Sequence, residues 1–387
     1  PNRAARSEED AIVMADEIGY PLVVRPSYVL GGRAMDIVHS RKDLEAYMRE
    51  AIKVSNDSPV LLDRFLDDAV EMDVDAVSDG DEVRIGGIMQ HIEQAGVHSC
   101  SLPPYSLRPE LVEEIKRETR LLAEALKVKG LMNVQLAVQH AYSENPKVYI
   151  LEVNPRASRT VPFVCKATGE PLAKIAARVM VGQTMKQQGV KVEVTPKYMC
   201  VKEAVFPFTK FLGVDPVLGP EMRSTGEVMG VGASFGEALY KAELGAGDRL
   251  PEKGTAFISV RDVDKARAVS VATHLRDQGF NIVATRGTAA LLQHAAIPCR
   301  VVNKVSEGRP NVVDMIKNGD VQLVIATADE SRTQISDARQ IRQTALAQLG
   351  VVYYTTISGA AAAVEGQKHA KDVEVRSLQE LHAMNRA

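Results

Sequence analysis

The sequence predicts a protein of two domains that combines an α+β fold with an α/β fold. Its 387 residues exceed the roughly 100–200 residues typical of one domain. In the last third of the chain, short apolar segments alternate with helical stretches, a rhythm typical of a parallel sheet. These segments lie near Phe257, Ile282, Val301, Val324 and Val352. In the earlier part, amphipathic helices are mixed with hairpin signals, which indicates α+β structure.

The first elements can be placed from their end signals. Ser7 is a helix cap, followed by an apolar face and stopped by Gly19. A strand over 22–25 follows, and Pro26 ends it. The glycine-rich loop around Gly31-Gly32 then leads into a second strand. We therefore expect a helix and a pair of strands joined by a glycine loop.

A long helix and a hairpin follow, and then a linker. The apolar spacing predicts a helix from Pro109 to Gly130, and strands over 131–140 and 147–154 flank a turn. The glycine-rich stretch 245–249 predicts a linker. The predicted domains are 1–247, with a core to about residue 181 and a connecting segment, and 248–387.

Composition excludes several classes of function. Lysine and arginine total 47 against 50 acidic residues, so no overall positive field attracts nucleic acid or an anionic membrane. No apolar run approaches the roughly 18 residues of a membrane span. The cysteines lie 35 or more residues apart without a C-x-x-C pair, which argues against a zinc or disulfide scaffold: they are Cys100, Cys165, Cys200 and Cys299. We expect a cytoplasmic protein with no nucleic-acid or membrane partner.

The second strand of the hairpin carries a candidate metal site. Glu152, Asn154 and Arg156 follow one another at every second position, so their side chains emerge on one face. A hairpin centred between 143 and 144 places Gln135 opposite Glu152. Carboxylate and amide oxygens suit Mg²⁺, and Arg156 would clamp a phosphoryl oxygen. A surface ion pair at a strand end is the alternative.

Three weaker patterns each have a plain structural alternative. The Gly31-Gly32 loop beside Arg25 suits a phosphate, but it is also typical of a hairpin turn. The polar stretch around His91 favours hydrogen bonding to a ligand over zinc, and a structural histidine is the alternative. The turn 285–288 opens a helix after a strand, which is an anion site or only a helix cap.

With these residues in hand, the chain resembles the C-terminal half of the large subunit of carbamoyl phosphate synthetase over essentially its whole length. Four long segments carry the resemblance: 23–35, 91–99, 152–163 and 219–227. The resemblance implies an ATP-grasp domain, N-terminally incomplete, followed by a methylglyoxal-synthase-like Rossmann-type α/β domain. The resemblance also implies that the sequence begins inside the ATP-grasp fold, and the Gly-Asp-Ser-Ala stretch usual in the family is absent between Ser99 and Cys100.

The resemblance also implies roles in carbamate phosphorylation by ATP. Gln135, Glu152 and Asn154 would ligate two Mg²⁺ or Mn²⁺ ions, with K⁺ as a further ion. Arg25 and Arg156 would hold phosphates and, with Glu152 and Asn154, form the catalytic set. The nucleotide pocket would also include the following residues: Arg64, where the family commonly has His, Leu66, Glu71, Gly96, Val97, His98 and Ser99.

For the second domain, the resemblance implies binding of effectors such as UMP, IMP or ornithine. The positions that match the family's phosphate site are Ser259, Lys265, Thr285, Gly287, Thr288, Lys304 and Thr327. Glu93, Glu203 and Thr355 match positions tied to ornithine. Methylglyoxal synthase activity is not expected, because no Gly-Gly-Asp motif follows Lys304.

The implied function is one step of glutamine-dependent carbamoyl phosphate synthesis for pyrimidine and arginine biosynthesis. The implied partners are the N-terminal half of the large subunit and the glutaminase small subunit. Contacts of the effector domain favour a homo-oligomer. The alternative is a catalytically incomplete fragment that only binds effectors and oligomerises.

Overall fold

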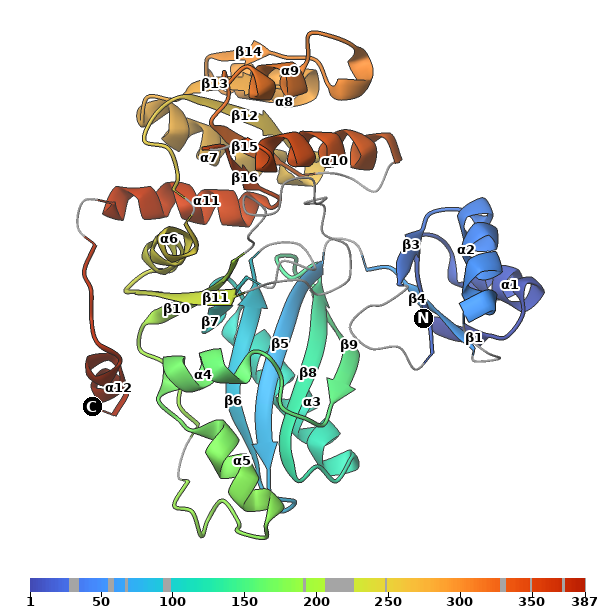
Figure 1. Ribbon diagram of the computed structural model, residues 1–387, viewed down its shortest axis with the longest axis vertical. Helices are drawn as coiled ribbons and strands as arrows, with labels where there is room; N and C mark the ends of the chain where they lie inside the picture. The colour runs from blue at the N-terminus through green and yellow to red at the C-terminus, as the bar shows by residue number, and fades with distance from the viewer. Residues whose placement is uncertain are drawn as a thin grey trace. The chain divides into compact units, whose positions relative to one another are not determined.

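The computed structural model describes residues 1–27, 35–54, 59–66, 69–92, 99–190, 193–205, 226–247, 249–327, 332–348, 350–370 and 373–386. These residues form two compact units (Figure 1). The first comes from the range Pro1–Asp68, and the second holds the described residues from Ala69 onward. Among all the residues that the structure describes, none of the helices is long and apolar enough to cross a lipid bilayer.

The first unit is a four-stranded antiparallel sheet with two helices. Its strand order is β1-β4-β2-β3. Ser7 Oγ accepts a hydrogen bond from the Asp10 amide, which confirms the predicted helix cap. The core packs Leu22 and Leu62 against Leu44 of the second helix. The elements are β1 (Asn2–Ala5), α1 (Glu8–Ile18), β2 (Leu22–Pro26), β3 (Asp36–Val38), α2 (Arg41–Val54) and β4 (Val60–Arg64).

The second unit begins with a seven-stranded antiparallel sheet, ordered β11-β10-β7-β6-β5-β8-β9. The hairpin predicted between residues 131 and 154 is confirmed as its β8–β9 edge. The strands are β5 (Ala69–Ser78), β6 (Val83–His91), β7 (Cys100–Leu102), β8 (Gly130–Gln139), β9 (Lys147–Asn154), β10 (Met199–Val205) and β11 (Gly226–Gly232).

Helices cover both faces of this sheet. On one face, α3 (Pro109–Ala125) packs its Ile115 against Val74. On the other, α4 (Val161–Thr168) and α5 (Leu172–Met180) enclose Val77. Figure 1 shows α4 and α5 in front of the sheet. Because side chains alternate along a strand, each strand serves two cores.

The predicted helix from Pro109 to Gly130 is too long at its C-terminal end. The helix stops at Ala125, and Lys127 adopts a left-handed conformation with φ +52°. Gly130 instead begins β8 with φ +112°. The prediction failed because lysine holds a left-handed turn here, where glycine or asparagine is usual.

The last part of the second unit confirms the predicted parallel α/β arrangement. Its five strands are all parallel, in the order β14-β13-β12-β15-β16. The strands are β12 (Thr255–Ser259), β13 (Asn281–Ala284), β14 (Cys299–Val301), β15 (Leu323–Ala326) and β16 (Val352–Tyr354). The helices are α7 (Lys265–Asp277), α8 (Arg286–His294), α9 (Val312–Lys317), α10 (Arg332–Leu346) and α11 (Ile357–Gly366).

Two further helices connect the parts of this unit. The first, α6 (Phe235–Ala246), packs on β10 and β11. It includes Gly245 and Ala246, so the predicted linker is wrong at its start; Ser234 caps the helix, and Gly247 ends it with φ +96°. The second, α12 (Leu378–Arg386), packs against α4. The domain boundary at residue 247 stays a prediction.

Candidate functional site

A row of polar residues crosses three neighbouring strands of the seven-stranded sheet. Gln135 lies opposite Glu152 on β9, as predicted, and opposite Asp73 on β5. Directly paired residues point to the same face of an antiparallel sheet. The three side chains therefore rise together, on the face that packs against α4.

A second polar row runs beside the first, two residues along each strand. Asn133 pairs with Asp75 on β5 and with Asn154 on β9. Its Nδ2 atom lies 3.0 Å from Asp75 Oδ1 and 3.3 Å from Asp73 Oδ1, so this amide joins the two rows on β5. On β9, Asn154 Nδ2 donates to Glu152 Oε1 at 2.8 Å. The two rows form one hydrogen-bonded surface.

The donor chemistry of these rows fits a hard divalent cation. Glu152 offers a carboxylate, and Gln135 and Asn154 offer amide oxygens; Mg²⁺ prefers such groups and completes its shell with water and phosphate. Asn154 already touches the Glu152 carboxylate. If the Asn154 amide rotated, its oxygen would face the Glu152 carboxylate, and the two groups could bind one cation together. Arg156 follows two residues later, and its amide donates to the Asn154 carbonyl at 2.8 Å.

A buried histidine extends the polar surface onto β6. His91 Nε2 lies 2.8 Å from Asp73 Oδ2, and Nδ1 lies 3.4 Å from Glu71 Oε2. Burial lowers the pKa of His91, but the hydrogen bond and charge of Asp73 and the charge of Glu71 together raise it above the usual value. Glu71, which is predicted to bind the nucleotide, thus lies beside the hydrogen-bonded pair of Asp73 and His91.

Ser99, which is predicted to bind the nucleotide, contacts Glu203, which is predicted to bind ornithine. Ser99 Oγ donates to Glu203 Oε1, and the Ser99 carbonyl accepts from the Ile92 amide at 3.0 Å. The Ile92 carbonyl in turn accepts from Thr356 Oγ1 at 2.9 Å, next to the buried Thr355. Ser99 and Thr356 therefore pair with the two backbone groups of Ile92, and Glu203 is joined to them through Ser99. Four other predicted residues lie outside the described part of the chain: Glu93, Gly96, Val97 and His98.

The remaining nucleotide candidates belong to the first unit. Arg25 Nε lies 3.5 Å from Asp63 Oδ2, and burial raises the pKa of Asp63 although Arg25 opposes the shift. Arg64 donates to the Tyr20 carbonyl at 2.9 Å, beyond the end of α1. Leu66 is half-buried. Arg64 thus has a structural role within this unit, and its nucleotide contact stays a prediction.

The predicted effector site is assembled at the carboxyl ends of the parallel strands. Ser259 Oγ, on the last residue of β12, lies 3.1 Å from Thr285 Oγ1, on the residue that follows β13. Thr288 Oγ1 accepts from the Val260 amide at 3.3 Å, and Thr327 Oγ1 accepts from the Arg261 amide at 2.9 Å. Open parallel sheets bind ligands at this edge.

Cations flank these hydroxyl groups. Lys265 Nζ lies 2.6 Å from Asp262 Oδ1, and a side chain on Gly287 would meet that ammonium. The hydrogen bond and charge of Lys265 lower the pKa of Asp262, and Lys304 adds to the same shift. Both lysines therefore act on one region beside the four hydroxyls. This arrangement suits a phosphate group.

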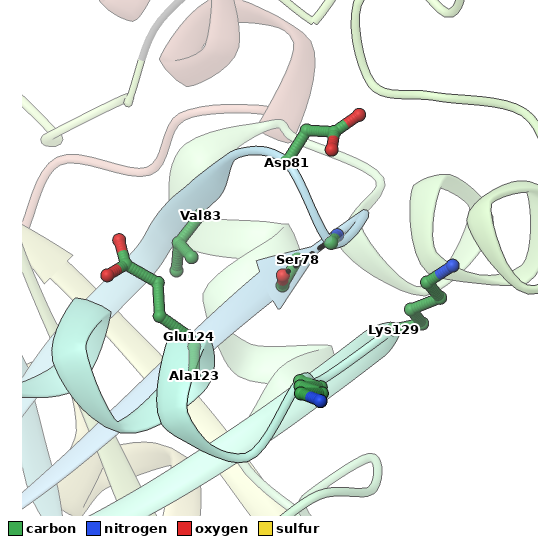
Figure 2. Close-up of a pocket in the computed structure, with 8 residues that line it drawn as sticks. Ser78, Asp81, Val83, Ala123, Glu124 and Lys129 are labelled. Carbon is green, nitrogen blue, oxygen red and sulfur yellow. Dashed lines mark hydrogen bonds between the residues drawn. The ribbon is translucent and has the colours of Figure 1, made fainter.

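A pocket of about 220 Å³ lies elsewhere, between the β5–β6 turn and the end of α3. Its lining includes Ser78, Asp81, Glu124 and Lys129, and it contains none of the predicted site residues. Figure 2 shows the Asp81 and Glu124 carboxylates pointing in different directions. These two carboxylates do not converge on one ligand, so no function is assigned to this pocket.

Sequence reasoning missed Asp73, Asp75 and Asn133, which form the centre of the polar surface. All three are buried, and Asp75 has no exposed surface. The signal was present: acidic residues at 71, 73 and 75 alternate with apolar ones, which places three carboxylates on one face of a strand. The buried cation Lys202, paired with Glu227 at 3.0 Å, was also missed.

Comparison with known families defines the class of protein. Residues 1–188 match the family described as carbamoyl-phosphate synthase L chain, ATP binding domain, and residues 267–355 match the MGS-like domain. Two solved structures have a similar fold at 17% sequence identity. They are a biotin carboxylase from Campylobacter jejuni in complex with β,γ-ATP, with TM-score 0.51 and coverage of 62% of each chain, and the biotin carboxylase domain of Hydrogenobacter thermophilus 2-oxoglutarate carboxylase, with TM-score 0.50 and coverage of 62% and 59%. The chain thus combines an ATP-grasp fold with an MGS-like domain.

Relatives of higher sequence identity are carbamoyl phosphate synthase large chains. The chain is 66% identical to the carbamoyl phosphate synthase large chain of Ralstonia nicotianae, over 99% of this chain and 36% of that protein. It is 58% identical to the large chain of Pasteurella multocida, over 98% and 36%. The chain is therefore a homologue of carbamoyl phosphate synthase large chains, and it spans about a third of their length.

Proposed function

We propose that this chain carries out ATP-dependent phosphorylation of carbamate to carbamoyl phosphate, as one step of glutamine-dependent carbamoyl phosphate synthesis for the pyrimidine and arginine pathways. The observation that carries the proposal is the register that places Gln135 opposite Glu152, with Asn154 hydrogen-bonded to the same carboxylate. The similarity to large chains along the whole sequence supports it.

In this proposal, Glu152, Asn154 and Gln135 hold two Mg²⁺ or Mn²⁺ ions, and K⁺ binds nearby. The ions supply neutralisation of the phosphate charges of ATP. Arg156 and Arg25 bind phosphoryl oxygens and stabilise the charge that develops during transfer. Glu71 and Ser99 belong to the nucleotide pocket together with Arg64, Leu66 and the residues 96–98. No protein nucleophile takes part, because the carbamate oxygen attacks the γ-phosphorus of ATP, the bond from that phosphorus to the β,γ-bridging oxygen breaks, and ADP leaves.

The second domain, proposed as residues 248–387, binds effectors. Hydroxyl groups near the ends of β12, β13 and β15 support a nucleoside monophosphate such as UMP or IMP, together with Lys265 at the start of α7 and Lys304 after β14. Glu203 and Thr355 support a site for the amino group of ornithine. The N-terminal half of the large subunit, the glutaminase subunit and a second copy of the chain are the proposed partners, in the cytoplasm.

The proposal is tested by ATP formation from MgADP and carbamoyl phosphate, the reverse of the step. The Glu152→Gln variant keeps the size of the side chain but removes its charge. We expect its rate to fall by more than about 10–100-fold, because even the loss of a residue that only supports a metal ligand costs that much. Glu144→Gln, in the exposed turn of the same hairpin, is the matched control. An unmodified chain that binds UMP but forms no ATP would favour a fragment that only binds effectors.

A further inference from the structure

Asp75 holds the segment that follows the predicted metal ligands. Its Oδ1 accepts from Ser158 Oγ at 2.7 Å, and its Oδ2 accepts from Thr160 Oγ1 at 2.6 Å. The two hydroxyls are themselves 2.7 Å apart. Both oxygens of this buried carboxylate thus accept hydrogen bonds from residues that lie 83 and 85 positions further along the chain.

These hydrogen bonds hold a segment of the chain that crosses from β9 back to β5. Asn154 ends β9 at the edge of the sheet, and β8 separates β9 from β5. To reach Asp75, the segment 155–160 must turn back over β8. Arg156 lies within this crossing, between the β9 pairing at one end and the Asp75 carboxylate at the other. A loop tied at both ends restricts the positions open to the residue between them.

Capping of α4 does not explain these contacts. Thr160 is the residue before that helix, where a threonine hydroxyl usually accepts a backbone N–H. Its side chain makes no such bond, and the hydroxyl donates to Asp75 instead. The N-terminus of α4 therefore lacks the side-chain cap that Thr160 could have provided.

The burial of Asp75 is costly by itself. Its hydrogen-bond donors Ser158, Thr160 and Asn133 are all neutral, and burial raises the pKa of the carboxyl against their opposing effect. A buried charge satisfied by neutral donors stabilises a fold less than a well-packed apolar side chain. A role beyond stability accounts for its presence.

We propose that Asp75 is a positioning residue, which fixes the segment 155–160 so that Arg156 stays beside the Glu152 and Asn154 ligand set. This inference rests on the proposed function of that set. Asn133 supports the same arrangement. Its amide joins Asp75 to Asp73, and the residue lies opposite Asn154 in the sheet.

Hydrogen exchange tests the positioning without any need for activity. In Thr160→Val and Asp75→Asn, we expect amide exchange of residues 156–160 to rise by about tenfold or more, with β5 and β8 unchanged. Thr119→Val is the matched control, because that buried hydroxyl donates to the Ile115 carbonyl within α3. Unchanged exchange in 156–160 overturns the proposal, and Thr160→Val decides it if Asp75→Asn does not fold.

Kinetics then separate positioning from a general structural effect. Thr160→Val should lower kcat for ATP formation and leave the KM for MgADP nearly unchanged, and Thr160→Ser should recover most of the rate. In an Arg156→Ala background, Thr160→Val should cost little more, because its effect passes through Arg156. Equal losses in both backgrounds would refute this route. If the unmodified chain forms no ATP, the proposed function fails, and the exchange result alone decides the role of Asp75.

Discussion

At the scale of single residues, the polar surface depends on charges that are buried as a group. His91 has 9% of its surface exposed, and Asp73 has 4%. Neither would be placed in a core alone, because an unpaired buried charge is costly. The 2.8 Å contact between them offsets that cost. Their mutual dependence makes the histidine a sensitive reporter of the site.

The raised pKa of His91 predicts a pH-dependent contribution to stability. A histidine whose pKa is higher in the folded state stabilises the fold fully below its unfolded value of 6.5 and loses that contribution as pH rises through the folded pKa. The difference in free energy of unfolding between the unmodified chain and His91→Asn should therefore be larger at about pH 6 than at about pH 9. Urea denaturation measures it, and a difference that grows with pH would contradict the assignment.

The thiols offer a second prediction for single residues. Burial raises the pKa of Cys100 and that of Cys200 to about 12, so almost no thiolate is present near neutral pH. In the native protein, iodoacetamide should label the partly exposed Cys165 well before either of them. Mass spectrometry of digested, partly labelled protein gives the order. Early labelling of Cys200 would mean that β10 opens readily.

At the scale of elements, the C-terminal helix α12 is joined to α4 through the last carbonyls of that helix. Asn385 Nδ2 donates to the carbonyls of Ala167 and Thr168, at 3.2 and 3.3 Å. His382 Nε2 lies 2.7 Å from the Lys166 carbonyl. Helix ends leave such carbonyls without partners, so α12 supplies what α4 cannot supply itself. The same α4 begins at the segment that Asp75 holds.

Removal of the apolar anchor of α12 should release it. Leu381 is 5% exposed and packs in the core beside α4, and Leu381→Ala should weaken docking by about 2 kcal/mol or more. Limited trypsin digestion should then cleave faster after Arg376, which precedes the helix. Leu378→Ala, at a position on α12 with 37% exposure, is the matched control and should change the rate much less.

At the scale of the whole molecule, the two proposed ligand sites lie on different sheets. The hydroxyls and lysines of the five-stranded sheet belong to loops after parallel strands, whereas the metal-ligand set belongs to a hairpin of the antiparallel sheet. Thr356 joins the two sheets through its bond to Ile92. Because the two sets of residues share no member, the sites should still be separable in binding.

Lys265→Ala should weaken UMP binding by about tenfold or more, because a charge-assisted hydrogen bond to phosphate is worth about 1.5–3 kcal/mol. MgADP binding should stay unchanged. Lys253→Ala, an exposed lysine before β12, is the control of equal charge. Calorimetric titration with each nucleotide measures both. Equal weakening of UMP and MgADP binding would contradict separate sites.

Local patterns were sufficient where neighbours along the chain decide the structure. The Ser7 cap, the β8–β9 hairpin and the parallel strands of the second sheet were all predicted from spacing and end signals. The pairing of Gln135 with Glu152 was correct for an incomplete reason. Near the turn the pairs are centred on Ser143, as for Gln139 and Lys147, and a bulge beside Leu136 then shifts the register.

By itself, the sequence determined the fold class, the β8–β9 hairpin and the parallel strands of the second sheet, because each depends on periodicity or on end signals a few positions apart. Only the tertiary structure decided that Asp75 would hold Ser158 and Thr160, and that Arg64 would bind the end of α1. These contacts join residues more than 40 positions apart, whose meeting depends on how strands pair and chains cross a sheet. No local pattern specifies such a meeting, since it is selected by the burial and hydrogen bonding of the whole fold.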